Sequence, residues 1–218
     1  MVTPRASERV EMEAKKESDS GMFSTHLPIQ VSGAFTMTNG LLLMMAKNEG
    51  PVSLDREASK KYAALTGLGV GAGWLATTIL LSQYYNPYGS ANKERSGMPK
   101  GSSREQLARE RMAEESIDRA AAIGRRLTWL SVISQAGTSA YMTINAPKSS
   151  LVQMTSAASI VVALAPLIFK YRWQRVANEQ EDYKKKIYGP VASLGYFNIP
   201  SGPQQTSLLP GLLVSWRY

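Results

Sequence analysis

Two runs of small polar side chains carry most of the chemistry that this chain offers, because both lie inside long stretches without a charged residue. The first run is Ser32, Thr36 and Asn39, with Gly33 and Gly40 beside it. The second run is Thr128, Ser131, Gln135 and Thr138. Each run repeats at intervals of three or four residues, which places its members on one face of a helix. The spacing therefore predicts two polar stripes.

Three kinds of chemistry fit two such stripes. Polar side chains at membrane depth are costly unless they are paired, so we expect the stripes to face each other and form hydrogen bonds between helices. One alternative is a water-lined path, as in a small channel or transport component. The other is a slot for the polar group of a lipid, quinone or pigment. We favour hydrogen-bonded packing over both alternatives.

Acid–base and metal chemistry have few candidate residues. The sequence has no cysteine and a single histidine, His26, at the entrance of the first span. Thiol catalysis, thiolate metal sites and bis-histidine haem ligation are therefore excluded. A proton-driven transporter needs an ionisable group inside the membrane, and the uncharged stretches contain no Asp, Glu, Lys or Arg. We expect no catalytic residue, no metal and no cofactor, only bound lipid, and we place His26 at the level of the lipid headgroups.

A glycine-rich segment contains two overlapping pairs of glycines four residues apart. Its members are Gly67, Gly69, Gly71 and Gly73. Glycine pairs at this spacing let two helices approach closely in lipid. A dinucleotide-binding loop has similar letters, but it must join a strand to a helix in a βαβ unit, and no such unit is predicted here. The segment is therefore predicted to be a helix-packing surface.

Four uncharged stretches are long enough to hold these motifs in membrane-spanning helices. A helix needs about 20 residues to cross the hydrocarbon core, and each stretch has at least 21. They predict spans over residues 28–46, 63–84, 127–146 and 150–171. A turn over residues 86–89 follows the second span, and Pro166 is expected to bend the fourth. The predicted fold class is all-α: an integral membrane protein with a four-helix transmembrane domain over residues 28–171.

The loop between the second and third spans is predicted to be largely helical. Ser102 or Ser103, followed by Glu105 or Gln106, predicts a capping box at its start. The charged run 104–126 contains no proline, so the helix is expected to continue into the third span. Acids alternate with bases along this run, which favours contact with lipid headgroups over nucleic acid.

The two ends of the chain differ in composition. Residues 1–27 mix acids and bases and predict a solvated N-terminal tail that is partly helical over residues 6–17. Residues 172–218 predict a short polar helix followed by an irregular apolar tail, because the uncharged stretch 187–216 contains four prolines and four glycines. An apolar tail of this kind needs a surface to lie against. Its expected anchors are Tyr196, Phe197 and Trp216.

Orientation follows from the distribution of the basic residues. With four spans, 20 of the 25 Lys and Arg residues lie on the side that holds both termini and the long loop. The positive-inside rule places that side in the cytoplasm or its equivalent. The expected location is a bacterial inner membrane or an equivalent organellar inner membrane. The aromatic residues expected at the same membrane surface are Tyr84, Tyr85, Tyr88, Trp129, Tyr171 and Trp173.

Taken together, these features favour a non-catalytic structural or accessory subunit of a larger membrane complex. The missing intramembrane charges argue against an enzyme, and the glycine segment and the apolar tail both favour contact with protein. The expected partners are other membrane protein subunits and membrane lipids, without nucleic acid. The channel or transport component and the lipid-, quinone- or pigment-binding protein remain the alternatives.

Overall fold

The computed structural model describes residues 5–21, 25–47, 53–147, 150–188, 191–202 and 205–215. The chain divides into two compact units. The first, Val2–Val176, is helical. The second, Ala177–Tyr218, contains the end of one helix and a β-hairpin.

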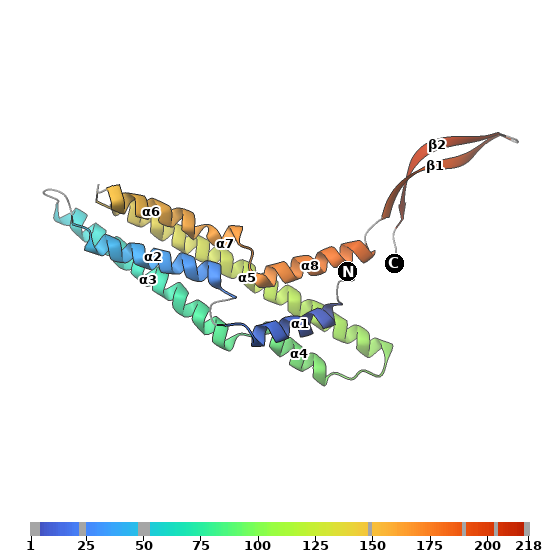
Figure 1. Ribbon diagram of the computed structural model, residues 1–218, viewed down its shortest axis with the longest axis horizontal. Coiled ribbons are helices and arrows are strands. Elements are labelled where there is room, and N and C mark those ends of the chain that lie inside the picture. Colours follow the sequence, from blue (N-terminus) through green and yellow to red (C-terminus); the bar gives the residue numbers. More distant parts are fainter. Residues whose placement is uncertain are drawn as a thin grey trace. The chain divides into compact units, whose positions relative to one another are not determined.

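The helices of the first unit form two groups that share one long helix, α5. In chain order the helices are α1 (Ala6–Ser18), α2 (Leu27–Met45), α3 (Leu54–Tyr84), α4 (Pro87–Gly97), α5 (Ser103–Asn145), α6 (Ser150–Ala163), α7 (Ala165–Ile168) and α8 (Arg172–Tyr188). One group is α2, α3 and α6 packed around α5, and the other is α1 and α4 packed on α5 (Figure 1). The all-helical prediction is confirmed for this unit.

The long helix α5 begins at the predicted capping box. The Ser102 hydroxyl accepts a hydrogen bond from the Glu105 backbone N–H at 3.2 Å, and the Glu105 carboxylate accepts one from the Ser102 N–H at 2.9 Å. From there the helix runs without a break for 43 residues. The charged loop and the third predicted span are thus one continuous helix, as expected from the absence of proline.

Two prolines act differently from the prediction. Residues 86–89 do not form a free turn, because Pro87 starts α4, where a first-turn proline loses no helical hydrogen bond. Pro166 interrupts the fourth predicted helix instead of bending it: α6 ends at Ala163, and the proline lies in the first turn of the short α7. The predicted segment 150–171 is therefore two helices.

The N-terminal segment is a packed helix, and the expected solvated tail does not describe it. Ala6, Val10 and Ala14 recur every four residues along α1 and form a buried face. This face packs on α4 and α5. These three small apolar residues make only a weak amphipathic pattern, because nine charged residues surround them in the first 20 positions. The sequence pattern therefore did not predict the buried face.

Two segments have the length and composition to cross a membrane. One lies within Leu54–Gly97, which holds α3, and the other within Leu151–Lys186, which holds α6 and α7. The core helix of a soluble protein would also pass this test, but it would be mostly buried. Only 22% and 28% of the two apolar windows are buried. Both segments therefore turn most of their apolar side chains outward.

The C-terminal tail is a β-hairpin, which corrects the prediction of an irregular tail. β1 (Val191–Gly202) pairs with β2 (Gln205–Ser215) in antiparallel register, with Gly195 opposite Gly211. Its prolines and glycines exclude a helix, but each strand of a two-stranded sheet has a free edge where proline is tolerated. Tyr196 and Phe197 lie in β1, and Trp216 lies outside the described residues.

Candidate functional site in the interior of the helix bundle

Polar side chains fill much of the interior formed by α2, α5 and α6. Ser32 and Ser131 have no exposed surface, and Thr36 and Asn39 are each 1% exposed. Large apolar side chains of the same helices, such as Ile133, are exposed. The interior therefore holds many polar side chains beside an apolar cluster that includes Leu43 and Met142, while large apolar side chains lie on the surface.

Gln135 of α5 is the residue at which the two predicted stripes meet. Its side-chain oxygen accepts hydrogen bonds from the hydroxyls of Ser32 and Thr36, the second at 3.3 Å. The hydrogen bonds expected between the two helices are therefore present. Its side-chain nitrogen has no hydrogen-bond partner among the described atoms, and neither does the Ser139 hydroxyl one turn further along α5.

The other predicted members of the α5 stripe bond elsewhere. The Thr128 hydroxyl donates to the Gly124 carbonyl at 2.9 Å, and the Ser131 hydroxyl donates to the Thr128 carbonyl at 2.9 Å. Thr138 is buried. The Thr128 and Ser131 hydroxyls therefore bond within α5, and the Thr128 hydroxyl also accepts a hydrogen bond from the Gln174 side-chain nitrogen of α8 at 3.3 Å. Only part of the predicted stripe therefore joins α5 to α2.

Sequence reasoning missed the contribution of α6 to this interior. Asn39 of α2 donates from its side-chain nitrogen to the hydroxyls of Ser156 and Ser159, each at 3.3 Å. Both serines are buried. Their spacing of three residues inside an uncharged stretch was the available signal, but the apolar character of that stretch masked it.

Two of the four predicted packing glycines bring α3 against α2. A methyl group on Gly71 would lie 2.5 Å from the Gly33 carbonyl oxygen and 2.5 Å from the Met37 nitrogen. A methyl group on Gly67 would lie 3.2 Å from the Gly40 Cα. Distances below 3 Å leave no room for a side chain. The two backbones are therefore in direct contact, which only glycine permits at Gly71.

The other pair, Gly69 and Gly73, faces away from this contact. A methyl group on either residue would have no atom within 4 Å. Of the two overlapping pairs in the sequence, the described structure thus uses Gly67 and Gly71 within the chain. Gly69 and Gly73 lie on the exposed face of α3.

Aromatic rings surround His26 where α2 begins. The imidazole lies 5.3 Å from the ring of Tyr171 and 5.7 Å from that of Trp173, and Trp173 lies 5.4 Å from Tyr85. A methyl group on Gly124 would lie 3.2 Å from Tyr171, so the cluster packs directly on the backbone of α5. Burial lowers the pKa of His26 to about 4. Three of the six aromatic residues predicted at one membrane surface, Tyr85, Tyr171 and Trp173, therefore lie together.

A buried ion pair joins α1 to the start of α8. Glu13 is 6% exposed, and its carboxylate lies 2.9 Å from the Arg172 guanidinium. Burial raises the pKa of Glu13, but the hydrogen bond from Lys16 and the charge of Arg172 outweigh it, so the pKa lies below its ordinary value. The carboxylate therefore stays charged and holds α1 in place.

Glu17, one turn further along α1, binds the start of α4. Its carboxylate accepts hydrogen bonds from the backbone N–H groups of Tyr88 and Gly89, both at 3.0 Å. An anion at a helix N-terminus is favourable for charge reasons as well. Burial nevertheless raises the pKa of Glu17. Neither glutamate contact was predicted, because their partners lie 71 to 159 residues away in sequence.

The described side chains of this interior pack and form hydrogen bonds with one another. No three His, Asp or Glu side chains gather to hold a metal ion in the part of the chain that the structure describes. Comparison with protein-family models, curated proteins and solved structures finds no match for this chain.

Proposed function

We propose that this chain is a four-span membrane protein that serves as a non-catalytic structural or accessory subunit of a larger membrane complex. The observation that carries the proposal is the polar interior of the bundle, in which side chains bond to one another and an apolar surface surrounds them. Such an interior holds helices together, while such a surface suits lipid and protein partners.

The helix α5 supports the placement of the third span. Over its N-terminal part it buries Ala113 and Ile117 and exposes charged residues, as a helix in water does. Over its C-terminal part it buries Ser131 and Gln135. The exposed residues of that part are Trp129, Leu130, Ile133 and Ile144, among others. Near Gly124 the exposed residues of α5 therefore change from charged to apolar, and the buried residues change from apolar to partly polar. A helix that passes from water into lipid requires such a change.

The buried polar side chains account for the lower hydropathy of two predicted spans, compared with the two most apolar segments. In α2 and the C-terminal part of α5, buried Ser, Thr, Asn and Gln side chains lower the average hydropathy. Their outward residues remain apolar: Val31, Phe35 and Leu42 of α2 are all exposed. We therefore retain α2 and residues 127–145 of α5 as the first and third spans.

Direct hydrogen bonds favour packing over the two alternatives. A water-lined path between α2 and α5 would leave Ser32, Ser131 and Gln135 accessible to solvent, but all three have no exposed surface. A headgroup slot would need space beside the same residues. We propose both termini on the cytoplasmic side of an inner membrane, because of the distribution of basic residues.

A matched pair of cysteine substitutions tests the position of the membrane. Glu115 and Ile133 both lie on α5 and are similarly exposed. The Glu115 side chain is 70% exposed, and Ile133 as a whole residue is 65% exposed. The chain has no cysteine of its own. In intact membranes a water-soluble maleimide should label Glu115→Cys but not Ile133→Cys, while both should react after denaturation. Equal labelling of both in membranes would contradict the proposed third span.

The subunit role is tested by removing the hairpin. We expect deletion of residues 191–218 to leave the protein in the membrane fraction after alkaline extraction but to reduce recovery of its partners in a pull-down. The full-length chain, expressed at the same level, is the control. Unchanged partner recovery would eliminate the hairpin as the docking segment, and the absence of any stoichiometric partner for the full chain would contradict the subunit role.

A further inference from the structure

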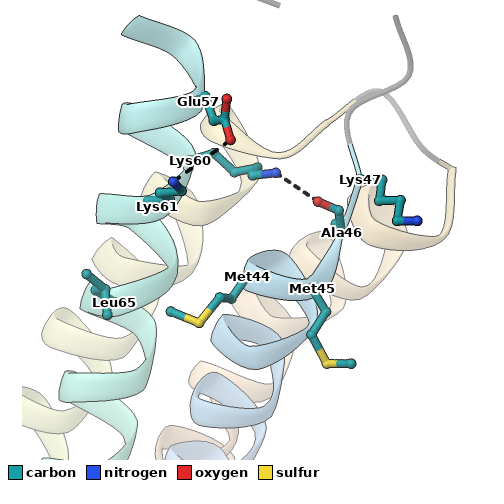
Figure 2. Close-up of a pocket in the computed structure, with 8 residues that line it drawn as sticks. All are labelled: Met44, Met45, Ala46, Lys47, Glu57, Lys60, Lys61 and Leu65. Carbon is teal, nitrogen blue, oxygen red and sulfur yellow. Dashed lines mark hydrogen bonds and ion pairs between the residues drawn. The ribbon is translucent and has the colours of Figure 1, made fainter. Parts of the chain in front are cut away.

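An open groove lies between the end of α2 and the beginning of α3, at the end of the bundle opposite to α1. It has a volume of about 510 Å³. Figure 2 shows Met44 on α2 and Leu65 on α3 along its walls, and lysines from both sides at its rim. The lining residues are Met44, Met45, Ala46, Lys47, Glu57, Lys60, Lys61 and Leu65.

One lysine of the rim has a structural role. Lys60 is 7% exposed, and its ammonium donates to the Ala46 carbonyl at 2.8 Å (Figure 2). Ala46 caps the C-terminus of α2, where a cation is favourable. Lys60 thus fixes the end of α2 against α3 and adds a positive charge to the groove.

The other two lysines are available for a ligand. Lys61 lies 3.9 Å from Glu57, and both side chains are about half exposed or more, so this ion pair is weak. Lys47 is exposed and has no ion-pair partner among the described residues. Among the described residues that line the groove, three lysines and one glutamate give a net positive charge.

Apolar groups lie directly below this charge. Met45 is 78% exposed and Leu65 is 54% exposed, although both border the charged rim. Exposed methionines adapt their shape to apolar ligands. An amphipathic ligand with an anionic head would place its charge on the lysines and its hydrocarbon on the methionines and Leu65.

We propose that this groove binds an anionic phospholipid, with its phosphate at the lysine-bearing rim and the start of an acyl chain along Met44 and Leu65. The proposal rests on the four-span arrangement proposed above, which puts the groove at the membrane surface. Only five of the 25 basic residues fall on that side, and three of them line this one groove. Charge complementarity therefore selects an acidic lipid over a zwitterionic one.

Native mass spectrometry of the full chain in detergent tests this proposal, with phosphatidylglycerol and phosphatidylcholine as probes. We expect phosphatidylglycerol to be retained in preference. The double variant Lys47→Gln, Lys61→Gln should weaken its binding about tenfold. The matched control, Lys93→Gln with Lys100→Gln, removes the same charge from exposed positions outside the groove and should change binding less than about twofold. Glu57→Gln should strengthen binding, which gives a readout that loss of folding cannot imitate.

Three outcomes would overturn the proposal. Equal weakening by both double variants would mean that net charge alone attracts the lipid. Equal retention of phosphatidylcholine would mean that the lysines do not select a headgroup. Displacement of the lipid by millimolar inorganic phosphate would identify a free-anion site instead. None of these outcomes bears on the labelling of Glu115→Cys and Ile133→Cys, so failure of the lipid site and failure of the membrane placement are distinguishable.

Discussion

The contact between α2 and α3 and the contact between α1 and α4 join neighbouring helices by opposite chemistry. Between α2 and α3 the backbones touch at glycines, with Gly71 against Gly33. Between α1 and α4 the buried apolar face of α1 is flanked by charged contacts: Glu11 lies 3.0 Å from Arg95, and Glu17 accepts hydrogen bonds from the first backbone N–H groups of α4. The first contact depends on close approach of two backbones, and the second on burial of an apolar face with charged contacts at its edge.

This difference is what two solvents would produce. In water, burial of apolar surface drives helices together, and charged groups add specificity at the edges. In lipid that drive is absent, so close approach and hydrogen bonds must replace it. Substitutions that alter shape should therefore damage the α2–α3 contact, while substitutions, salt or pH that alter charge should damage the contacts of α1.

The largest effect is expected at Gly71. A leucine there would overlap the α2 backbone, so Gly71→Leu should prevent the α2–α3 contact. We expect it to lower the free energy of unfolding by about 3 kcal/mol or more. Gly69→Leu is the matched control, because it adds the same side chain to the same helix at a position with no neighbour within 4 Å. Thermal unfolding in detergent measures both.

Comparable melting temperatures for these two leucine variants would show that α3 does not pack on α2 through Gly71. A loss in Gly69→Leu alone would show that the exposed pair of glycines forms the important contact, with another protein or a second copy of the chain.

The next effect is expected at the buried ion pair of α1. Glu13→Gln should cost about 3 kcal/mol, because it leaves the charge of Arg172 without its buried partner. Glu11→Gln, at a half-exposed ion pair of the same helix, should cost less than about 1 kcal/mol. Hydrogen exchange of α1 amides and the melting temperature measure the difference.

The pH dependence has a defined sign. Because the pKa of Glu13 is lowered in the folded protein, its contribution is complete above its ordinary pKa of 4.5 and is lost as the pH falls through the folded value. Equal destabilisation by Glu13→Gln and Glu11→Gln would mean that Arg172 does not depend on Glu13.

The sequence predicted the parts of this architecture that depend on local pattern. The capping box at Ser102 and the unbroken course of α5 follow from residue types within a few positions. The hydrogen bond of Ser32 to Gln135 follows from two helical stripes that must satisfy each other, although the particular pairing does not. Of the glycines, the spacing identified both pairs but could not tell which pair faces α2.

The remaining features depend on long-range contacts. Arg172 and Glu13 are 159 positions apart in the sequence, and no helical or strand periodicity predicts that they form an ion pair. The hairpin was not predicted. Its prolines and glycines argue against a helix in lipid, but they do not exclude paired strands, which satisfy the same backbone groups. The residues around Pro87 predict a turn, because a proline that starts a helix and a proline in a turn occur in the same local sequence.

A smaller effect is expected at the boundary between the two kinds of contact, where His26 lies. Its pKa is about 4 in the folded protein and 6.5 ordinarily, so the unfolded chain takes up a proton first as the pH falls. Stability should therefore decrease between pH 6.5 and 4, by an amount on the order of 3 kcal/mol when complete. In His26→Gln this part of the pH dependence should disappear, while the part due to carboxylates remains. Identical pH profiles for the two proteins would mean that His26 is not enclosed by its aromatic neighbours.

The smallest effect concerns the hydrogen bond between Ser32 and Gln135, and it decides whether the polar interior holds the bundle together. Interhelical hydrogen bonds in lipid contribute about 0.6–2 kcal/mol, so a double-mutant cycle with Ser32→Ala and Gln135→Met should give a coupling energy in this range. Thr143 supplies the control, because its hydroxyl donates to the Ser139 carbonyl of its own helix at 2.8 Å. Ser32→Ala and Thr143→Ala should therefore be additive.

A coupling energy near zero for the first pair would mean that the two stripes meet without stabilising each other. Glycine contact would then be the main force between these helices, and the polar interior would need a different explanation, such as a path or a bound polar group.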